Sequence, residues 1–289
     1  MKFKNLAYLL LAFCTTTTFA ACNELDGDNS DFDFGHSAGA AENPYKDGYG
    51  RLPNSIRLAT YNTHRCEGWE TQTNVDRANY NNTAKVISLI DPDVIALQEL
   101  DKFTTWHPHD QLQELADRTG MKPYYCKTID YRGGDYGIGI LSKREPLRTV
   151  SGDLPGTEAR KFFLAEFDDY IFIATHLETT NRAQSVEIIN AYIAANYASY
   201  TKPIFLAGDF NESNMSSEMM VKLKEKWEII STSSNTFMNT ATPKRIDYIV
   251  LYKGNKAACE VLGTAVPSYD EINVNKVSDH LPVLVDIKK

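Results

Sequence analysis

The chain has 289 residues, of which 43% are hydrophobic and 24% charged, and its 38 acidic and 30 basic residues give a net charge of −8. This is ordinary globular composition, sufficient for one large domain or two small ones. The acidic balance excludes an overall positive field that would draw the protein to nucleic acid or to an anionic membrane, so any polyanion binding has to be local.

The first residues have the layout of a secretory signal. MKFKNLAYLLLAFCTTTTFAAC carries lysines, a short apolar core and small residues ahead of Cys22. The apolar stretch is too short for a permanent membrane-spanning helix. FAAC resembles a bacterial lipobox, which implies cleavage before Cys22 and a lipid on its sulfur, and a plain signal peptide cleaved after an alanine is the alternative. We therefore expect residues 1–21 to be a signal peptide and the protein to act outside the cytoplasm, as a periplasmic or cell-surface lipoprotein or, without lipid, as a secreted protein.

Residues 22–52 are acidic, rich in glycine and without a helical or strand period, which predicts a flexible tether. The acidic stretch after Cys22 resembles the surface-export signal of Bacteroidetes lipoproteins. From residue 53 to 289 no long polar linker interrupts the apolar runs, so we expect one domain there, as a monomer. Its cysteines lack metal-binding spacing and are expected to be buried or exposed thiols, with one disulfide as an alternative: Cys66, Cys126 and Cys259.

Short apolar runs predict strands, and apolar residues at three- and four-residue steps predict helices. Between 181 and 198 such a stripe should face the core: Val186, Ile189, Ile193 and Tyr197. This mixed order fits a doubly wound parallel sheet or two sheets packed face to face, and local pattern does not choose between them. The predicted helices are 77–90, 109–119, 181–198 and 215–226. The predicted strands are 56–62, 94–99, 136–142, 162–167, 171–176, 204–207, 246–251, 258–262 and 281–287.

Polar residues fall at the ends of these strands. In IFLAGDFNE, four apolar residues lead through a glycine to Asp209 and Asn211. Such residues often cap a following helix. Together with other polar residues at or beside predicted strand ends, they form one collection of candidate site residues. The ends of strands at one edge of a sheet can converge in space. The remaining members are Asn62, Glu99, His176, Asp279 and His280, with Asp247 inside RIDYIVL.

The collection suits a divalent metal. Glu99 closes the buried strand DVIALQE, where an unpaired carboxylate is costly unless it meets a cation or hydrogen-bond donors. Carboxylates with amides and waters suit Mg²⁺ or Mn²⁺ better than zinc. A single histidine on such a strand is usually a satisfied core residue, but two histidines among four carboxylates favour a functional site.

Seven stretches together resemble the endonuclease/exonuclease/phosphatase superfamily, the fold of deoxyribonuclease and neutral sphingomyelinase. They are TYNTH, DVIALQEL, YGIGILSK, ATHLE, LAGDFNE, RIDYIVL and SDHLPVLVDI, in the family's order and spread over nearly all of residues 56–287. The resemblance implies an α/β fold, a four-layer α/β/β/α sandwich of two packed mixed sheets with helices outside and the active site at one sheet edge. It also implies a metal-dependent hydrolase of phosphoester bonds.

The resemblance assigns the metal to three residues. Glu99 matches the family's metal-binding glutamate, and Asn62 matches the amide beside it. Asp279 is a further candidate ligand. The implied cofactor is Mg²⁺ or Mn²⁺.

The catalytic roles that the resemblance implies fall on five positions. Asp209 matches the residue that positions or deprotonates the attacking water, and Asn211 matches the one that orients water or holds phosphate. His176 and His280 match the histidines that bind phosphoryl oxygens and assist the leaving group. Asp247 matches the acid that hydrogen-bonds the final histidine and favours its protonated form.

One position departs from the best-known members. Two residues after Asn62, several nucleases carry an acid that helps with the metal, whereas this chain has His64. His64 is expected to be an alternative ligand, a phosphate contact or a structural residue. Arg160 resembles a position near the site in related bacterial members, and it or Arg182 would clamp phosphate, although a surface salt bridge is the commoner role of an arginine.

The substrate class stays open among nucleic acid, phospholipid headgroups and small phosphate esters. No basic segment interleaved with aromatic residues suggests a dedicated nucleic-acid surface, and no hydrophobic hairpin suggests entry into lipid, so membrane attachment is expected only through Cys22. This elimination favours a small or exposed phosphoester, with a nuclease or a sphingomyelinase-like phospholipase as the alternative. A surface lipoprotein that binds glycans or anions on the same scaffold without turnover is the rival class.

Overall fold

The computed structural model describes residues 44–45, 48–68 and 79–289. The expected signal peptide, the lipid attachment at Cys22 and most of the expected tether lie outside these residues. Within the described ranges, no helix has the length and the apolar character that crossing a bilayer requires.

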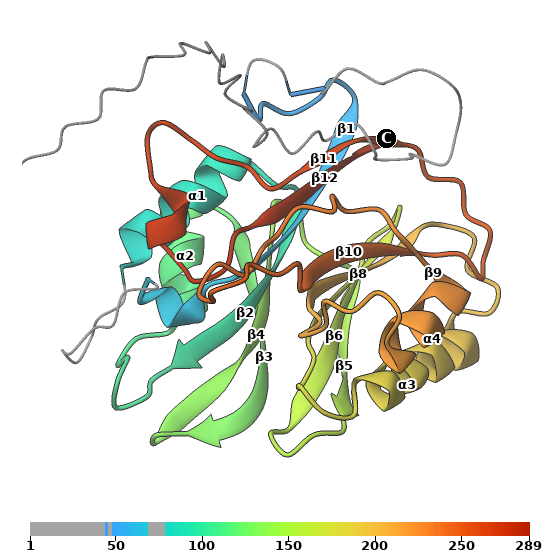
Figure 1. The fold of residues 1–289 in the computed structure, drawn as a ribbon, viewed down its shortest axis with the longest axis horizontal. Coiled ribbons are helices and arrows are strands. Elements are labelled where there is room, and N and C mark those ends of the chain that lie inside the picture. Colours follow the sequence, from blue (N-terminus) through green and yellow to red (C-terminus); the bar gives the residue numbers. More distant parts are fainter. Residues whose placement is uncertain (1–43, 46–47, 69–78) are drawn as a thin grey trace, which may run out of the picture. The chain divides into compact units, whose positions relative to one another are not determined.

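Two six-stranded sheets pack face to face, with helices on their outer sides (Figure 1). This confirms the predicted four-layer sandwich. The first sheet has the order β11-β12-β1-β2-β4-β3, with bounds β1 Ser55–Asn62, β2 Val94–Lys102, β3 Lys122–Tyr131, β4 Gly134–Ser142, β11 Val261–Ala265 and β12 Val283–Lys288. The second sheet has the order β5-β6-β7-β8-β10-β9, with bounds β5 Arg148–Leu154, β6 Arg160–Glu166, β7 Ile171–His176, β8 Ile204–Asp209, β9 Trp227–Ile229 and β10 Asp247–Tyr252.

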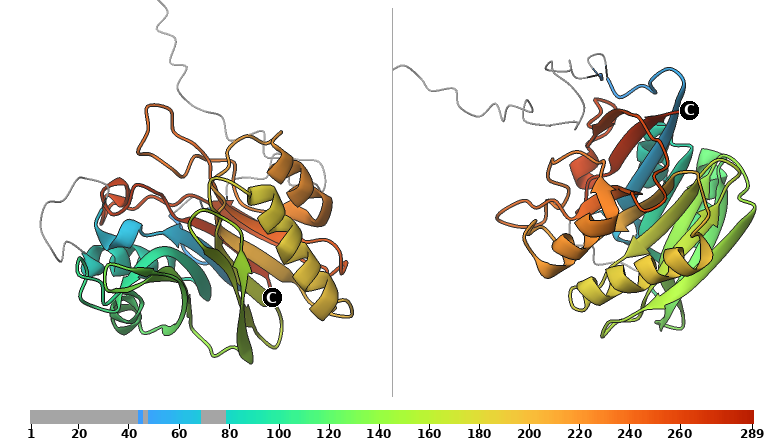
Figure 2. Two further views of the ribbon diagram at one scale, coloured as in Figure 1. Left: turned by 90° about the horizontal axis from the view of Figure 1, so that it is seen from below. Right: turned by 90° about the vertical axis from the view of Figure 1, so that its right-hand side faces the viewer.

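Two helix pairs cover the sheets on opposite sides. α1 (Tyr80–Ile90) and α2 (Gln111–Thr119) pack on the first sheet, and α3 (Arg182–Asn196) and α4 (Glu218–Lys226) pack on the second. Figure 2 shows the same separation of the two pairs from another direction. Every member of the predicted stripe on α3 is buried, which confirms its orientation toward the core.

Three apolar clusters hold these layers together. One lies between the sheets and includes Leu58 and Phe205, both fully buried. The others lie under the two helix pairs and include Val86 and Ile189. Because both faces of each sheet are covered, the central strands read as continuous apolar runs rather than alternating ones. This explains why the sequence located them well.

The topology brings the polar strand ends to one edge. The pairs β1–β2 and β7–β8 are parallel, so both strands of each pair end on the same side. The antiparallel neighbour β10 begins there, with Asp247 opposite Asp209. His176 is the register partner of Asp209 on the other side. His280 lies just before β12, the antiparallel neighbour of β1.

Local backbone features fix two of the site's acids. A Cβ on Gly208 would lie 1.9 Å from the carbonyl oxygen of Thr175, so only glycine lets β8 approach β7 just before Asp209. Glu99 lies where the β2–β4 register shifts, between Leu97 and Leu100, and has φ 58°. A bulge of this kind redirects a side chain away from the regular alternation of a strand.

The strand predictions from the sequence missed three strands and placed a fourth at the wrong residues. β3, β5 and β9 are edge strands, and β3 and β5 carry several exposed or half-buried residues instead of an apolar run. The strand predicted at 258–262 is β11, three residues later, around Gly263. The three cysteines of the domain are free. Residues expected at the end of the tether lie against the domain, since Arg57 donates to the carbonyl oxygens of Tyr49 and Gly50.

Candidate active site

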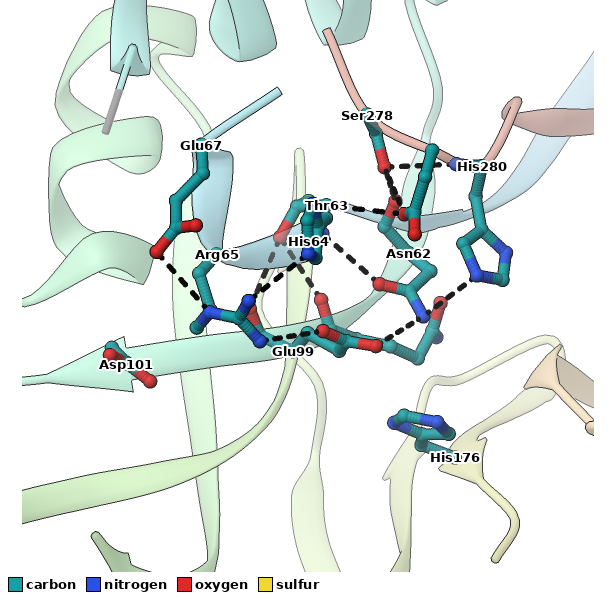
Figure 3. A network of polar contacts seen from close by, with 12 residues as sticks. Asn62, Thr63, His64, Arg65, Glu67, Glu99, Asp101, His176, Ser278 and His280 are labelled. Atoms are coloured by element: carbon teal, nitrogen blue, oxygen red, sulfur yellow. Dashed lines mark hydrogen bonds and ion pairs between the residues drawn. The ribbon is translucent and has the colours of Figure 1, made fainter. Parts of the chain in front are cut away.

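The side-chain amide of Asn62, at the end of β1, is the centre of the polar cluster (Figure 3). Its Nδ2 donates to Oε1 of Glu99 at 3.0 Å and to Oδ2 of Asp209 at 3.1 Å. The same nitrogen lies 3.4 Å from Nε2 of His280. Asn62 is fully buried. Because it contacts Glu99 of the first sheet and Asp209 of the second, its amide joins the two sheets at their common edge.

Glu99 is ionised and partly open to solvent. Its Oε2 lies 3.2 Å from Nη1 of Arg65, and its side chain is 17% exposed. Burial opposes the charge, but His176, Arg65 and the amide of Asn62 more than compensate and lower the pKa of Glu99 to about 2. The carboxylate is therefore negative throughout the physiological range.

The turn that carries Arg65 is strained. In the 3₁₀ turn η2 (His64–Cys66), the three residues have φ values of 46°, 54° and 58°. Left-handed backbone costs a residue other than glycine roughly 1–2 kcal/mol. Gln111 holds the turn by donating to the carbonyl oxygen of Arg65 at 2.7 Å. Strain of this kind persists only where surrounding contacts impose it, and it is typical of functional sites.

His280 is paired with an acid. Its Nδ1 lies 2.9 Å from Oδ2 of Asp247, and its ring packs against Phe237 with centroids 4.9 Å apart. Burial alone lowers the pKa of His280, but the carboxylates of Asp247 and Asp209 raise it to about 10. Nδ1 therefore donates to Asp247, and the protonated Nε2 faces Asp209 at 3.7 Å.

His176 has the opposite surroundings. Its Nδ1 lies 3.2 Å from Nη1 of Arg160, and its Nε2 lies 3.2 Å from Nδ2 of Asn211 and 3.5 Å from Oδ2 of Asp209. Burial and then Arg160 lower the pKa of His176 to about 3. A neutral imidazole accepts one hydrogen bond in its plane, and the guanidinium is the stronger donor. Nδ1 therefore accepts from Arg160, and Nε2 carries the proton.

Asp209 lies between these two histidines. Its Oδ1 accepts from the main-chain nitrogen of Asn211 at 2.8 Å. Burial and the like charge of Asp247 raise the pKa of Asp209 above its usual range, against the opposing charge of His280. An acid held in this way is a stronger base than an ordinary aspartate.

Most of the predicted site residues lie together. Contacts or register pairing join Asn62, Glu99, His176, Asp209, Asn211, Asp247, His280 and Arg160. Arg160 contacts Glu158 at 2.9 Å as well as His176, so its guanidinium is part of the wall of the site. Arg182, by contrast, bonds the carbonyl oxygen of Asn211 and the carboxylate of Glu212, and it holds the loop after β8.

Two of the three predicted metal ligands have different surroundings from Glu99. Asn62 faces the carboxylates with its NH₂ group, while its Oδ1 accepts from the main-chain nitrogen of His64 at 3.1 Å, so in this arrangement it orients Glu99 and offers no oxygen there. Asp279 contacts Ser278 and lies 3.9 Å from Nδ1 of His64; among the described residues it has no contact with Glu99. His64, which lies beside Asp279, also contacts the carbonyl oxygen of Gly68.

The donor set fits a divalent cation. Each oxygen of Glu99 has one described protein donor, which leaves acceptor capacity on an ionised and partly exposed carboxylate. Asp209, Asp247 and His280 also place ligand atoms within 4.8 Å of one another. Oδ1 of Asp247 is buried and has no hydrogen-bond partner among the described residues. Since Asp247 and Asp209 keep His280 protonated, and a protonated ring cannot bind metal, Glu99 is the stronger candidate ligand.

The sequence did not assign a role to Arg65 or Glu67. Both occur in HRCEGWE, directly after Asn62 and Thr63, and their charge was visible. Nothing in the pattern showed that the backbone turns left-handed there and directs Arg65 onto Glu99. Non-glycine residues in that conformation have no strong sequence signature.

Comparisons with known proteins agree with the fold. The profile described as "Endonuclease/Exonuclease/phosphatase family" matches residues 59–280. Solved structures with the same fold include an endonuclease/exonuclease/phosphatase from Bacteroides vulgatus, at 18% identity and a TM-score of 0.66, covering 81% of this chain and 98% of that one. A mannosyl-6-phosphatase of Bacteroides thetaiotaomicron has 16% identity and a TM-score of 0.61, covering 81% and 100%.

The human Nocturnin catalytic domain with bound sulfate anion has 16% identity and a TM-score of 0.60, covering 81% of this chain and 93% of that one. No curated protein matches the sequence. Members of the matching family are hydrolases of phosphoesters and generally depend on a divalent metal. The profile matches more than half of the chain, so the chain belongs to the endonuclease/exonuclease/phosphatase family.

Proposed function

We propose that the protein is a divalent-metal-dependent hydrolase of phosphoester bonds that acts outside the cytoplasm. The observation that carries this proposal is the contact of one buried amide with the acids of both sheets. Asn62 holds Glu99 and Asp209 within hydrogen-bond distance of the same nitrogen. Phosphoryl transfer requires mainly alignment and neutralisation of developing charge, which a rigid and nearly dry cluster of this kind supplies.

The side chains divide the proton chemistry among them. Asp209 is the base that orients or deprotonates the attacking water, because burial and Asp247 raise its pKa. His280, kept protonated by Asp247, donates Nε2–H to a phosphoryl oxygen or to the leaving group. His176 is neutral and contributes one N–H donor from the other side. The two histidines thus hold the phosphoryl group with one charged and one neutral donor.

Glu99 is the residue that would hold the metal, with Asn62 orienting it and Asp279 and His64 nearby as further candidates. Mg²⁺ or Mn²⁺ suits this oxygen-rich set. When bound, the cation supplies charge neutralisation for the phosphoryl oxygens.

The substrate we propose is a small or exposed phosphoester. The chain has an acidic net charge, and its sequence lacks a basic stripe for duplex binding. The fold shared with a mannosyl-6-phosphatase does not assign a substrate, but it makes hexose 6-phosphates a sensible first set to test. Nucleic acid and sphingomyelin are the competing substrates in the same screen.

The proposed location depends on the N-terminal sequence. We propose residues 1–21 as a signal peptide, Cys22 as the lipidated residue and 53–289 as a monomeric catalytic domain. Membrane fractionation tests this: the native chain should follow the membrane, and Cys22→Ala should release it. A native chain that stays soluble would leave the secreted alternative.

Activity is tested directly. Purified protein should hydrolyse p-nitrophenyl phosphate or bis(p-nitrophenyl) phosphate with Mg²⁺ or Mn²⁺, and EDTA should abolish turnover. His280→Ala should remove it as well. If no phosphoester in a panel of nucleic acids, sphingomyelin and sugar phosphates turns over while a glycan or an anion binds, the non-catalytic alternative is correct. Turnover that survives both EDTA and His280→Ala contradicts the proposal.

A further inference from the structure

Arg65 lies between two carboxylates. Its Nη1 lies 3.2 Å from Oε2 of Glu99, and its Nε lies 3.4 Å from Oε1 of Glu67. Figure 3 shows the guanidinium in this position, next to the ring of His64. The side chain of Arg65 is 20% exposed, so a guanidinium near the surface neutralises the carboxylate that is the candidate metal ligand.

A buried chain of charges anchors Arg65 from behind. Oε1 of Glu67 lies 3.1 Å from Nε2 of His107, and Nδ1 of His107 lies 2.7 Å from Oδ2 of Asp101. His107 and Asp101 are fully buried. Burial disfavours charge on His107, but Asp101 and Glu67 outweigh it and raise its pKa. Alternating charges thus run from the interior to the site, with Arg65 as the last cation before Glu99.

A divalent cation at Glu99 has to compete with this arginine. Arg65 already donates to Oε2, and Asn62 donates to Oε1. Two cations on one carboxylate also repel each other, and solvent screens this repulsion only in part because Arg65 and Glu99 are 20% and 17% exposed. We propose that Arg65 is a positioning residue that serves as the resident counter-cation of Glu99. It weakens the binding of a divalent metal, and it neutralises Glu99 when no metal is bound. This inference rests on the proposed function.

The proposal predicts opposite effects for two neighbouring charges. Without Arg65, a metal meets Glu99 free of competition and of repulsion, so it binds more tightly. Without the charge of Glu67, Arg65 is shared with no second acid and the field at Glu99 becomes more positive, so the metal binds more weakly. If the network were only structural, both changes would loosen the site and weaken binding.

Calorimetric titration of the full chain with Mg²⁺ and with Mn²⁺ tests this and needs no substrate. Arg65→Gln should lower the dissociation constant by about tenfold or more, and Glu67→Gln should raise it by about threefold or more. Arg65→Lys keeps the charge and should stay within about threefold of the native chain. Arg118→Gln, in which an exposed arginine of α2 loses its contact with Glu114, is the matched control and should leave the constant unchanged.

Each outcome of this titration either supports or overturns the proposed role of Arg65. Unchanged or weaker binding by Arg65→Gln overturns the inference. If circular dichroism shows that Arg65→Gln does not fold, Arg65→Met, which also removes the charge, replaces it, and unchanged or weaker metal binding by that variant overturns the inference. A native chain that binds metal and hydrolyses phosphoesters while Arg65→Gln behaves identically rejects the inference and leaves the proposed function intact. If the native chain binds neither metal and Arg65→Gln does, the inference stands and the proposed metal requirement fails; if neither binds, both fail.

Discussion

Nη1 of Arg160 lies 3.2 Å from Nδ1 of His176, so this histidine has a cation at the ring nitrogen where its counterpart in the site has a carboxylate. His280 meets Asp247 at the corresponding nitrogen. The two rings face the same oxygen of Asp209, at 3.5 and 3.7 Å. One ring is therefore neutral and the other charged, although the two residues look alike in sequence.

Replacing Arg160 should change the titration of His176. Burial and Arg160 together lower the pKa of His176 to about 3, so Arg160→Gln removes the second cause and leaves the first. The pKa should rise part of the way toward its ordinary value near 6.5. Imidazole resonances followed by NMR across the acid range measure it. Arg148→Gln, on the edge strand of the same sheet, is the control. An unchanged pKa of His176 in Arg160→Gln would contradict the hydrogen bond from Arg160 to Nδ1 and the tautomer assigned from it.

Stability should fall on the alkaline side because of His280. Its pKa is raised to about 10 in the folded protein, against about 6.5 in the unfolded chain. The folded state therefore holds this proton more tightly, and the resulting stabilisation is complete below pH about 6.5 and disappears as pH rises through about 10. The difference between the two pKa values corresponds to about 5 kcal/mol.

Urea unfolding at a series of pH values, with EDTA present, measures this contribution. The free energy of unfolding of the native chain should decline between neutral pH and pH 10, and His280→Gln should lack most of that decline. Curves that run parallel for the two proteins would show that His280 does not carry the alkaline dependence.

Asp209→Asn should separate activity from stability. The change keeps the shape of the side chain and removes a buried charge that Asp247 repels. Turnover should fall by about a hundredfold or more, because the base is lost. Thermal unfolding of the metal-free protein should occur at the same or a higher temperature. Asp153→Asn, which alters an exposed acid paired with Lys161, should leave both quantities unchanged, and a strongly destabilised Asp209→Asn protein would contradict the buried repulsion.

The sequence predicted what depends on continuous burial. The central strands are apolar on both faces, so each could be located, and the polar residues at the ends of several of them marked the site edge. Edge strands such as β5 were invisible because their burial is partial and their polar residues resemble those of loops. The choice between two fold classes required the family resemblance, because the pairing of β1 with β12 joins segments more than two hundred residues apart.

Within the site, residue types were predictable and orientations were not. Asn62 was expected to bind metal through oxygen, but its position between two carboxylates requires the NH₂ group to face them. Arg65 could not be placed, because its direction depends on a left-handed turn that the fold imposes. The charge of each histidine was also hidden, since it depends on one neighbour from another strand.

Arg57→Met should test how the domain begins. The fully buried guanidinium donates to both carboxylate oxygens of Asp286, at 2.8 and 2.7 Å, and to the carbonyl oxygens of Tyr49 and Gly50. Removing it leaves Asp286 buried with less compensation, which costs about 3–5 kcal/mol. The residue lies near the start of β1, and Asn62 ends that strand, so turnover per folded molecule should not change.

The double variant Arg57→Met/Asp286→Leu separates the buried charge from the lost anchor. An apolar pair of similar volume removes the uncompensated carboxylate, so it should be less destabilised than Arg57→Met alone. It should remain below the native chain, because Tyr45 also donates to Asp286 and the segment at Tyr49 loses its hydrogen bonds. Urea unfolding measures the native chain, the two single variants Arg57→Met and Asp286→Leu, and the double variant. If the double variant is as unstable as the sum of its single changes, the guanidinium stabilises the fold through the segment before residue 52 rather than through its charge.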